Sequence, residues 1–428
     1  MTGTESGGRA GAEELSALAR LISCDPDTFA AKHWARAALL STVAERAGTS
    51  GADDFRDLFS AEAVDELLST RALRTPFIRM AKNGTTLPES AYTIGGGVGA
   101  GVKDQVNDDA VLSLFADGAT IVLQGLHRTW EPITSWSSQL AAALGHPVQV
   151  NAYITPAQSQ GFADHYDVHD VFVLQVHGHK EWSIHEPVLA APLRDQPWAE
   201  RKNDVAQAAE GPPAIQHVLS PGDCLYLPRG FIHSAKALGG ISIHLTVGVH
   251  GWTRHHVAQA LLDQVHRGLP EQRPVRESLQ LGVDVTDPKH LTDDIEVVRA
   301  VLLQAIASAD AEQVARFMTA QARSAQRPEA VSPISSVAAL TQLDGSESLR
   351  LREHLALGRS APDESGQVQI RSRAGRVTLQ AEHVRALDML LRGEPVRVDD
   401  VAGNAEEARS AARILVKNGI AVLDSQDG

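Results

Sequence analysis

The sequence predicts an α+β protein in which a β-rich centre lies between helical segments. Apolar residues recur at helical spacing from about Glu13 to Met80, and the pattern changes to short β-rich runs from Thr120 to about Val249. After His250 the helical spacing returns, and the chain from about Ser332 ends in the order helix, short turn or strand, helix, strand. A chain of 428 residues exceeds one ordinary domain, so we expect more than one compact unit.

The first helical stretch is predicted from apolar side chains three or four positions apart. They are Leu15, Leu18, Leu21, Val64, Leu67 and Leu68. A glycine-rich run follows, from Gly95 to Gly101. We reject a dinucleotide-binding loop there, because no predicted strand leads into it and Ala100 would have to replace the third glycine of that motif. A flexible surface loop is the better interpretation.

The central region contains several short runs that are rich in β-branched and aromatic residues, punctuated by Gly, Pro and Asp. These runs are ATIVLQGL, PVQVNAYIT, VFVLQV, KEWSIHEP, CLYLP and SIHLTVGV. Many short strands without intervening helices predict an antiparallel sandwich or barrel. The segment that follows is predicted to be all helical, and the order of elements at the end resembles a winged helix.

Composition limits the class of protein. No apolar run approaches the roughly 18 to 20 residues of a membrane span, and the first residues lack the pattern of a secretory signal, so we expect a cytoplasmic protein. The two cysteines, Cys24 and Cys224, lie far apart, which argues against a disulfide framework or a thiolate zinc site. The net charge of −14 makes nucleic acid an unlikely partner and favours a basic protein.

Two histidines and an aspartate predict a metal site. On a strand, residues two apart face the same side, so His165 and Asp167 are expected to project together. His233 follows a turn-forming Pro-Arg-Gly segment and supplies a third ligand. Two imidazoles and one carboxylate form a facial triad, which holds Fe(II) and leaves coordination positions open for a cosubstrate and O₂.

A lysine is the candidate partner of an anionic cosubstrate. Lys180 follows the apolar run VFVLQV and a glycine turn, so we expect it to begin the next strand of the sheet. Inside a desolvated pocket, its ammonium group would make a strong contact with a carboxylate. The alternative is a solvated surface lysine, because lysines are rarely buried.

The metal ligands also have ordinary alternatives. An isolated His-X-Asp sequence often occurs by chance. His169 has the same strand parity as Asp167 and is the best rival ligand, although an extended strand would place it about 13 Å from His165. The combination of this motif, the downstream lysine and the late histidine is much less expected from chance.

At this point the sequence resembles a known family, the JmjC-type ribosomal oxygenases, also called the cupin-4 family. The resemblance rests on residues 151–156, 161–167, 170–182, 220–233 and 244–246. It extends over nearly the whole chain, although the outer parts match by layout more than by motif. It implies a double-stranded β-helix (cupin/JmjC) core with a helical preamble in residues 1–250, a helical dimerisation domain in 251–331 and a winged-helix-like domain in 332–428.

Residue by residue, the resemblance makes His165, Asp167 and His233 the Fe(II) ligands and Lys180 the partner of the 2-oxoglutarate carboxylate. It places Asn151 and Tyr153 in the pocket wall, with Thr246 as a weaker candidate for the same wall. Polar residues that alternate on a strand are often only its solvated face, which is the ordinary alternative for these three.

The family hydroxylates protein side chains with 2-oxoglutarate and O₂ as cosubstrates. The resemblance therefore implies a homodimeric enzyme that hydroxylates an arginine or histidine of a basic ribosomal protein. Other protein or peptide substrates, and lysine demethylation, would use the same iron chemistry. Two rivals are a metal-binding cupin sensor with a winged helix and no turnover, and a cupin enzyme that does not use 2-oxoglutarate.

Overall fold

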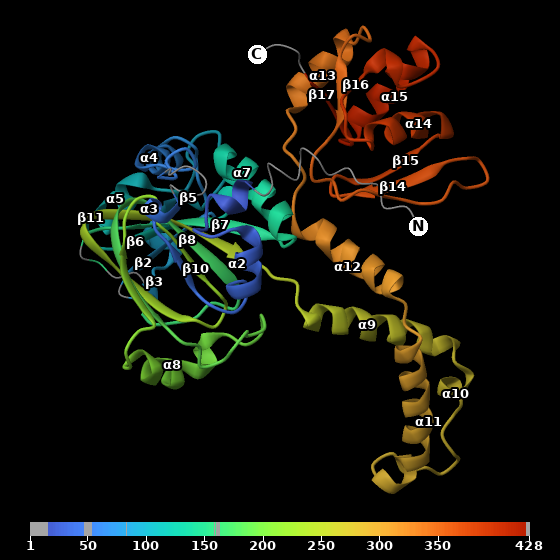
Figure 1. The fold of residues 1–428 in the computed structure, drawn as a ribbon, viewed down its shortest axis with the longest axis horizontal. Helices are drawn as coiled ribbons and strands as arrows, with labels where there is room; N and C mark the ends of the chain where they lie inside the picture. The colour runs from blue at the N-terminus through green and yellow to red at the C-terminus, as the bar shows by residue number, and fades with distance from the viewer. Residues whose placement is uncertain (1–15, 47–53, 83, 158, 160–162, 425–428) are drawn as a thin grey trace. The chain divides into compact units, whose positions relative to one another are not determined.

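The structure is a computed structural model that describes residues 16–46, 54–82, 84–157, 159 and 163–424. The chain divides into two compact units, Met1–Gly251 and Trp252–Gly428 (Figure 1). A division of the second unit near residue 331 stays a prediction. Among the described residues, no helix combines the length and the apolar composition needed to cross a membrane.

Unit 1 is built on one antiparallel sheet of nine strands. The strands are β1 (Leu39–Ser41), β2 (Ile78–Lys82), β3 (Thr85–Thr86), β6 (Thr120–Leu123), β7 (Val148–Thr155), β8 (Asp170–His185), β9 (Ile215–Leu219), β10 (Cys224–Leu227) and β11 (Ile232–Val249). Their order is β1-β10-β8-β11-β7-β6-β2-β3, and β9 also pairs with β8. This mixture of helices and an antiparallel sheet agrees with the predicted α+β class.

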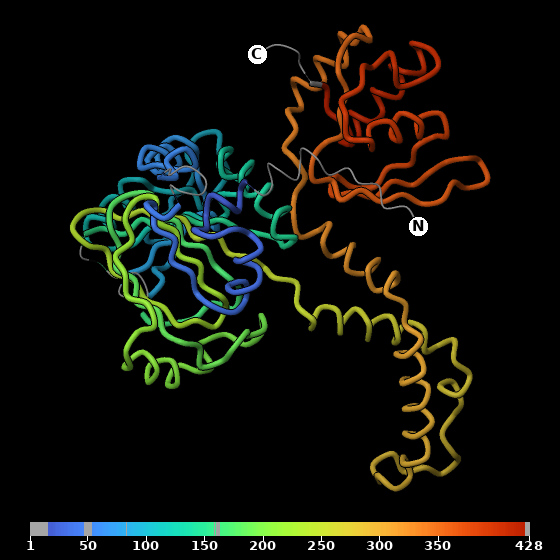
Figure 2. Tube along the Cα trace, viewed as in Figure 1, coloured from blue at the N-terminus to red at the C-terminus, as the bar shows by residue number. Residues whose placement is uncertain are grey.

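The two long strands β8 and β11 pair along most of their length and are central in the strand order. Figure 2 shows the path of the chain through the unit. The prediction of two separate strands on either side of Gly178 was wrong, because β8 continues through this residue. Gly178 has a φ of 63°, and an added Cβ would overlap the backbone of Ile241. Glycine therefore permits a close approach of two strands here rather than a turn.

The segment predicted as a helical preamble contains strands as well as helices. Helices α2 (Pro26–Lys32), α3 (Val43–Arg46) and α4 (Ala61–Ser69) alternate with β1 and β2. In α4 the predicted apolar residues Val64 and Leu67 are buried, whereas Leu15 lies outside the described residues. The all-helical interpretation was wrong because the three residues of β1 are too few to show a strand period, and their pairing with β10 is a long-range contact.

Helices also interrupt the region predicted to contain only short strands. They are α6 (Leu126–Thr129), α7 (Glu131–Leu144), the 3₁₀ helix η2 (Trp198–Arg201) and α8 (Lys202–Ala209). Helix α7 has a proline in its first turn and a left-handed Gly145 at its end, and both are standard helix-boundary signals. Both signals are present in the sequence, but α7 was not predicted from them. Helices α4 and α8 lie at opposite ends of unit 1 (Figure 1).

The glycine-rich run forms a loop, as predicted. It joins β4 (Thr93–Ile94) to β5 (Gln105–Val106), which pair with each other, and Gln105 also forms an isolated bridge with Arg74. The 3₁₀ helix η1 (Glu89–Ala91) precedes this hairpin, and helix α5 (Asp108–Ala116) follows it. No nucleotide-binding strand-to-helix turn is formed by these described residues.

Unit 2 begins with helices α9 (Arg254–Gly268), α10 (Arg273–Arg276), α11 (Pro288–Ala307) and α12 (Ala311–Ala325), together with the 3₁₀ helix η3 (Leu269–Glu271). Helix α9 packs against α11 and α12. The helical pattern predicted after His250 is therefore confirmed.

The last part of unit 2 has its own apolar core, which includes Leu349, Ile370, Leu387 and Leu415. Its elements are α13 (Pro333–Gln342), β12 (Ser348–Leu351), β13 (Gly358–Arg359), β14 (Val368–Ser372), β15 (Gly375–Leu379), α14 (Ala381–Leu390), β16 (Val396–Arg397), η4 (Val398–Asp400), α15 (Ala405–Lys417) and β17 (Ala421–Asp424). They form two three-stranded sheets, β16-β12-β17 and β13-β14-β15. The predicted order of helix, short strand, helix and strand is observed.

Candidate metal and cosubstrate site

Unit 1 contains a cavity of about 250 Å³ inside the sheet. Its lining includes His165, Asp167, Lys180 and His233, which lie far apart in sequence. Strands β7, β8 and β11 and the loop before β8 supply most of the wall. The fold thus brings the predicted metal ligands and the predicted cosubstrate lysine to one cavity.

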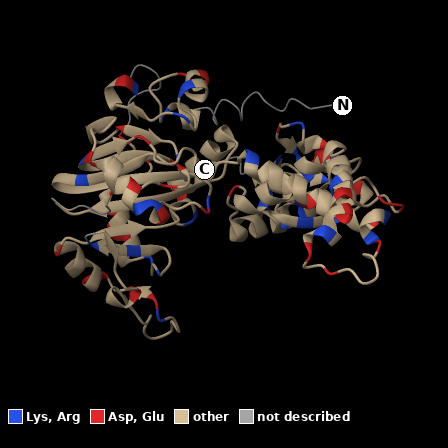
Figure 3. Cartoon of the chain, turned by 90° about the horizontal axis from the view of Figure 1, so that it is seen from below, with Lys and Arg blue, Asp and Glu red and all other residues tan. Residues whose placement is uncertain are grey.

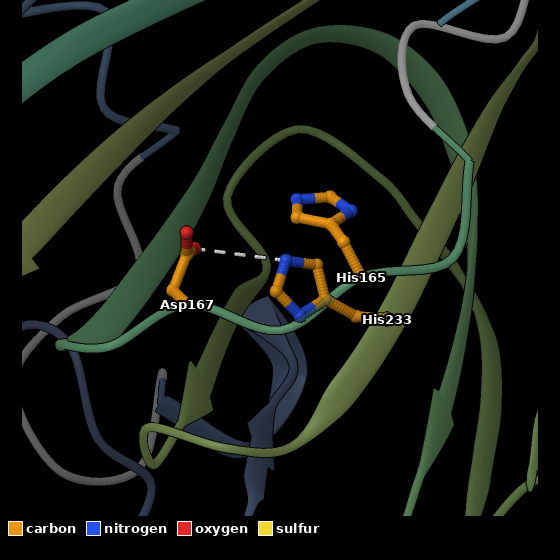
Figure 4. Close-up of side chains that lie close together, drawn as sticks. All are labelled: His165, Asp167 and His233. Atoms are coloured by element: carbon orange, nitrogen blue, oxygen red, sulfur yellow. Dashed lines mark ion pairs between the residues drawn. The ribbon is translucent and has the colours of Figure 1, made fainter. Parts of the chain in front are cut away.

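His165, Asp167 and His233 converge in this cavity. Each offers one ligand atom, and the three atoms lie within 4.8 Å of one another (Figure 4). Asp167 Oδ2 lies 3.7 Å from His233 Nε2, and the two imidazole centroids are 4.4 Å apart. Two imidazole nitrogens and a carboxylate oxygen at this spacing fit the donor set of a facial triad.

The backbone that carries these ligands differs from the prediction. His165 and Asp167 lie in the loop before β8 rather than on a strand, and only an isolated bridge joins His165 to His233. In that bridge, the His233 amide donates to the His165 carbonyl at 2.8 Å, and the His165 amide donates to the His233 carbonyl at 3.2 Å. This reciprocal pair holds two ligands in register although no regular strand is present.

A second backbone hydrogen bond links the segment that carries Asp167 to the turn before His233. The amide of Gly230 donates to the Asp167 carbonyl at 3.0 Å. Gly230 has a φ of 93°, and an added Cβ would overlap the Leu189 carbonyl. A glycine is therefore needed in the turn that leads to His233.

The hydrogen bonds of both histidines determine which ring nitrogen is available. His165 Nδ1 lies 2.8 Å from the Ala163 carbonyl, and His233 Nδ1 lies 3.0 Å from the Phe231 carbonyl. A carbonyl can only accept, so each Nδ1 carries the proton and each Nε2 presents its lone pair. This is the usual arrangement of metal-binding histidines, in which a backbone acceptor orients the ring.

The electrostatics of the triad also suit a cation. Burial lowers the pKa of His233 to about 4, so this ring is neutral at physiological pH. Burial alone would raise the pKa of Asp167, but electrostatic interactions with His169, His233 and His165 lower it. A neutral imidazole beside an ionised carboxylate is the protonation state in which these groups bind a metal.

Behind the triad, the buried carboxylate of Asp170 joins the two ligand-bearing segments. Asp170 begins β8, three residues after Asp167, and it accepts hydrogen bonds from the Tyr226 hydroxyl at 2.9 Å and the Arg229 amide at 3.0 Å. Arg229 lies in the turn that leads to His233. Such outer contacts fix the orientation of ligands and commonly tune metal affinity.

Lys180 is buried in the same cavity, with a relative exposure of 3%. Its Nζ donates to Thr155 Oγ1 at 3.2 Å, and the Thr120 hydroxyl lies 3.4 Å from that oxygen. Burial lowers the pKa of Lys180 to about 7. The alternative of a solvated surface lysine was therefore wrong, and so was its expected place at the start of a strand, since it lies within β8. No carboxylate among the described residues pairs with Lys180.

Comparison with known proteins agrees with this geometry. Residues 126–257, which contain the cavity's triad and Lys180, match the family model described as JmjC domain. This part of the chain is a JmjC domain. The predicted resemblance is thereby confirmed.

Curated relatives match the same unit. Ribosomal oxygenase 1 of Bos taurus is 32% identical over 227 residues, which cover 52% of this chain and 31% of the relative. The bifunctional lysine-specific demethylase and histidyl-hydroxylase NO66 of Drosophila persimilis is 29% identical over 241 residues, covering 54% and 31%. The match thus spans about a third of the length of these relatives.

Solved structures resemble the chain over a longer range. The crystal structure of Escherichia coli ribosomal oxygenase YcfD aligns with a TM-score of 0.53 at 16% identity, covering 94% of this chain and 99% of YcfD. YcfD in complex with cobalt and 2-oxoglutarate aligns with a TM-score of 0.51 at 17% identity, covering 95% and 99%. At this identity the likeness establishes the fold.

The other predicted pocket residues of the JmjC domain lie in different places. Tyr153 and Thr246 line the cavity, as expected. Asn151 lies outside the lining and accepts a hydrogen bond from the Gly125 amide at 3.0 Å, so its expected place in the wall was wrong. The reason is that Asn151 pairs with Thr246 across β7 and β11 but reaches the loop before α6 instead.

The rival ligand His169 is directed away from the triad. Its ring lies 5.2 Å from that of His250, and its Nε2 is 3.4 Å from the Gln149 amide nitrogen. It does not belong to the group of three ligand atoms. His169 was thus correctly ranked below the three ligands, although the extended strand on which its predicted distance rested is not present, because these residues form a loop.

Several cavity residues were not predicted, among them Arg79 on β2 and His244 on β11. His244 is buried, stacks on Tyr153 with ring centroids 5.1 Å apart, and has a pKa well below its ordinary value because of burial and the nearby charge of Lys180. Its position two residues before Thr246 was a usable signal, because both share one face of β11. Arg79 lies between the buried residues Ile78 and Met80 on β2, a strand in the segment that was predicted to be helical.

Proposed function

We propose that this protein is an Fe(II)- and 2-oxoglutarate-dependent oxygenase that hydroxylates a side chain of a protein substrate. One observation carries the proposal: a two-histidine, one-carboxylate triad and a buried lysine share one cavity of a JmjC domain. The names of the relatives, ribosomal oxygenase and histidyl-hydroxylase, support the same reaction class.

The residues fit the group that this proposal requires. His165, Asp167 and His233 would hold Fe(II) through two Nε2 atoms and one carboxylate oxygen, which leaves positions for a bidentate cosubstrate and O₂. Bound iron, with 2-oxoglutarate and O₂, supplies conversion of a substrate C–H into C–OH, while 2-oxoglutarate becomes succinate and CO₂. YcfD has been crystallised with cobalt and 2-oxoglutarate, which supports this choice of ligands.

In this proposal Lys180 binds the distal carboxylate of 2-oxoglutarate. Lys180 is buried beside the hydroxyl of Thr155 without a carboxylate partner, so its pKa is only about 7. Binding of the 2-oxoglutarate dianion favours the protonated, charged form of the lysine. Tyr153 and Thr246 shape the wall beside it, and Trp182 and His244 help exclude water. The protein thus contributes orientation, a fixed ligand set and a dry cavity.

The substrate we propose is an arginine or histidine of a ribosomal protein. The relatives that match the catalytic unit are ribosomal oxygenases, and the net charge of −14 favours a basic partner. Cytoplasmic location follows from this substrate. Cys24 and Cys224 are both free thiols, which agrees with that compartment.

We further propose that residues 251–331 form a homodimer interface and that residues 332–428 form a winged-helix-like domain. Helices α11 and α12 have no buried residue, and α11 exposes Ile295, Val298 and Leu303. An exposed apolar helix face of this kind is typical of a protein interface. The last part has the helix, strand, helix, strand order of a winged helix and a separate core.

The test is anaerobic loading with Fe(II), followed by detection of succinate after addition of 2-oxoglutarate, O₂ and an extract of basic ribosomal proteins. Wild type is expected to form succinate and to add one oxygen atom to a protein in the extract, which mass spectrometry detects. Asp167→Ala and Lys180→Ala should abolish both signals.

Lys236→Ala is the matched control, because Lys236 is an exposed lysine on the neighbouring strand β11. It should behave as wild type. If wild type binds metal but consumes no 2-oxoglutarate under these conditions, the metal-binding sensor becomes the better account. If Lys180→Ala retains full turnover, a cupin enzyme that does not use 2-oxoglutarate is favoured.

A further inference from the structure

The sheet β13-β14-β15 of unit 2 has one apolar face and one charged face. Val368, Ile370 and Leu379 turn towards the local core. Residues between them in sequence point the other way, because side chains alternate along a strand. On this outer face Arg371 and Arg376 are direct cross-strand partners, and both are exposed.

A third arginine reaches the same face from a helix. Gly358 on β13 is the cross-strand partner of Arg371, so its missing side chain leaves a space beside that residue. The Arg323 guanidinium of α12 occupies this space, and an added Cβ at Gly358 would overlap it. Arg323 Nε donates to the Ala356 carbonyl at 2.8 Å, which holds it in place. Arg323, Arg371 and Arg376 therefore form one line across the sheet, which we call the arginine row.

No residue of the arginine row has an ion-pair partner among the described residues. No ion pair there involves Arg323, Arg371 or Arg376, although Arg359 on the same sheet pairs with Asp388 of α14. Like charges placed directly opposite each other destabilise a pair of strands. A bound anion would relieve this repulsion, and guanidinium groups match phosphate and carboxylate oxygens in a bidentate geometry.

The surroundings of the row indicate which anion fits. In the described part of the chain after Val337, no large hydrophobic side chain is strongly exposed. The sequence also contains no Phe, Tyr or Trp after Phe317. The face therefore lacks both the apolar anchor of a protein interface and the aromatic platform that stacks on unpaired bases. Exposed Gln369 and Thr378 flank the row and provide neutral donors.

We propose that the arginine row binds the phosphodiester backbone of a nucleic-acid duplex without reading its sequence. Contacts of arginine, glutamine and threonine with phosphates position a protein on a duplex but carry no base information. This function lies beyond the proposed oxygenase activity and does not depend on it.

The proposal changes the expectation that nucleic acid is an unlikely partner. That expectation rested on the net charge of the whole chain. Acidic and basic residues are intermixed over both units (Figure 3). At physiological ionic strength, charges farther away than about 8 Å are largely screened. The affinity of the arginine row for an anion therefore depends on the charges near the row rather than on the net charge of the chain.

The test is fluorescence anisotropy of the full chain with labelled RNA and DNA duplexes of the same sequence, over a salt series. Three phosphate contacts predict a plot of log K against log salt with a slope of roughly −2.7. Arg371→Gln/Arg376→Gln should make this slope shallower by about two. Gly358→Ala should also weaken binding, because its methyl group displaces Arg323.

Arg359→Gln is the matched control, since this exposed arginine lies on the same sheet but is already paired with Asp388. It should leave both affinity and slope unchanged, and circular dichroism should show that every variant is folded. The affinities for the two duplexes identify which one fits the row better. The proposal is wrong if the double variant binds both duplexes as wild type does, or if poly-L-glutamate of equal charge displaces them equally well.

Discussion

The two units of this protein differ in where they bury polar groups. Unit 1 buries Lys180, His233 and His244 in the cavity wall and further polar groups elsewhere, whereas in unit 2 the described buried polar residues are Ser372 and His383. Burial of a polar or charged group without compensation costs free energy. The larger number of such groups in unit 1 therefore indicates that the candidate functional site lies in this unit.

Exposed apolar residues show the opposite distribution. Unit 2 exposes Leu262, Ile295, Leu303 and Ile334, largely on helices with no buried residues. A surface of this kind is suited to binding another protein surface rather than to a reaction. Changes in unit 1 should therefore affect turnover, and changes in unit 2 should affect association.

The largest expected effect is that of Asp167→Ala. Loss of the carboxylate leaves two histidines, so the affinity for Fe(II) should collapse and turnover should fall to the level of the metal-free protein. Anaerobic metal titration and the succinate assay measure both changes. Retained metal-dependent turnover would remove Asp167 from the ligand set.

Lys180→Met should separate cosubstrate binding from stability. The KM for 2-oxoglutarate should rise by about 100-fold, because a bound carboxylate loses its only buried cationic partner on β8. The variant without cosubstrate should melt at a higher temperature than wild type, because methionine buries no charge. An unchanged KM would show that another residue holds the carboxylate.

Asp170→Asn should weaken metal binding, although Asp170 is not one of the candidate metal ligands. An amide cannot accept both hydrogen bonds that the carboxylate receives from Tyr226 and Arg229 without reorientation, so the loops that carry Asp167 and His233 should loosen. We expect a loss of about 10- to 100-fold in Co(II) affinity.

Asp223→Asn provides the matched control for this change. Asp223 is also buried and accepts two amide hydrogen bonds, but their donors, Val43 and Ser220, lie outside the ligand loops. It should lower the melting temperature by a comparable amount and leave Co(II) affinity unchanged. Equal losses of Co(II) affinity in both variants would contradict a positioning role for Asp170.

The affinity for 2-oxoglutarate should fall as pH rises. Burial lowers the pKa of Lys180 to about 7, so the free protein loses the binding charge above this pH. Affinity should decrease by about tenfold per pH unit above 7, and Lys180→Arg should abolish that dependence. The same shift makes unfolding harder as pH rises from about 7 towards the unfolded pKa, because the buried lysine is then neutral. Calorimetric titration at several pH values tests the sign.

The smallest effect on turnover is expected for Leu303→Glu in α11. A buried carboxylate at an apolar helix interface should dissociate a dimer, while succinate formation without a protein substrate changes by less than about twofold. Light scattering reports the mass. A monomeric wild type would contradict the proposed interface.

The sequence predicted the site more completely than it predicted the strands. His165, Asp167, Lys180 and His233 were identifiable because few chemical roles require that combination. The backbone that holds them was not, since the bridge between His165 and His233 and the continuation of β8 through Gly178 depend on contacts between distant segments. For the same reason, the pairing of β1 with β10 could not be inferred from three residues.

Side-chain direction was the other limit of prediction. Tyr153 and Asn151 share one face of β7, yet only Tyr153 reaches the cavity, because the Gly125 amide binds the Asn151 side chain. Arg79 was missed because its strand lies in a segment whose composition resembles helix. The sequence pattern predicts which side chains share one face of a strand. The packing of neighbouring segments determines which of these side chains reaches the cavity.

The most direct measurement is a paired calorimetric titration of Co(II) and then 2-oxoglutarate into wild type, Asp167→Ala and Lys180→Ala. We expect substitutions in the metal triad and at Lys180 to affect metal binding and 2-oxoglutarate binding separately. Asp167→Ala should fail to bind Co(II), and Lys180→Ala should bind Co(II) as wild type does but 2-oxoglutarate at least about 100-fold more weakly. If Asp167→Ala keeps its Co(II) affinity, or if Lys180→Ala binds 2-oxoglutarate normally, the assignment of this cavity as the metal and cosubstrate site is contradicted.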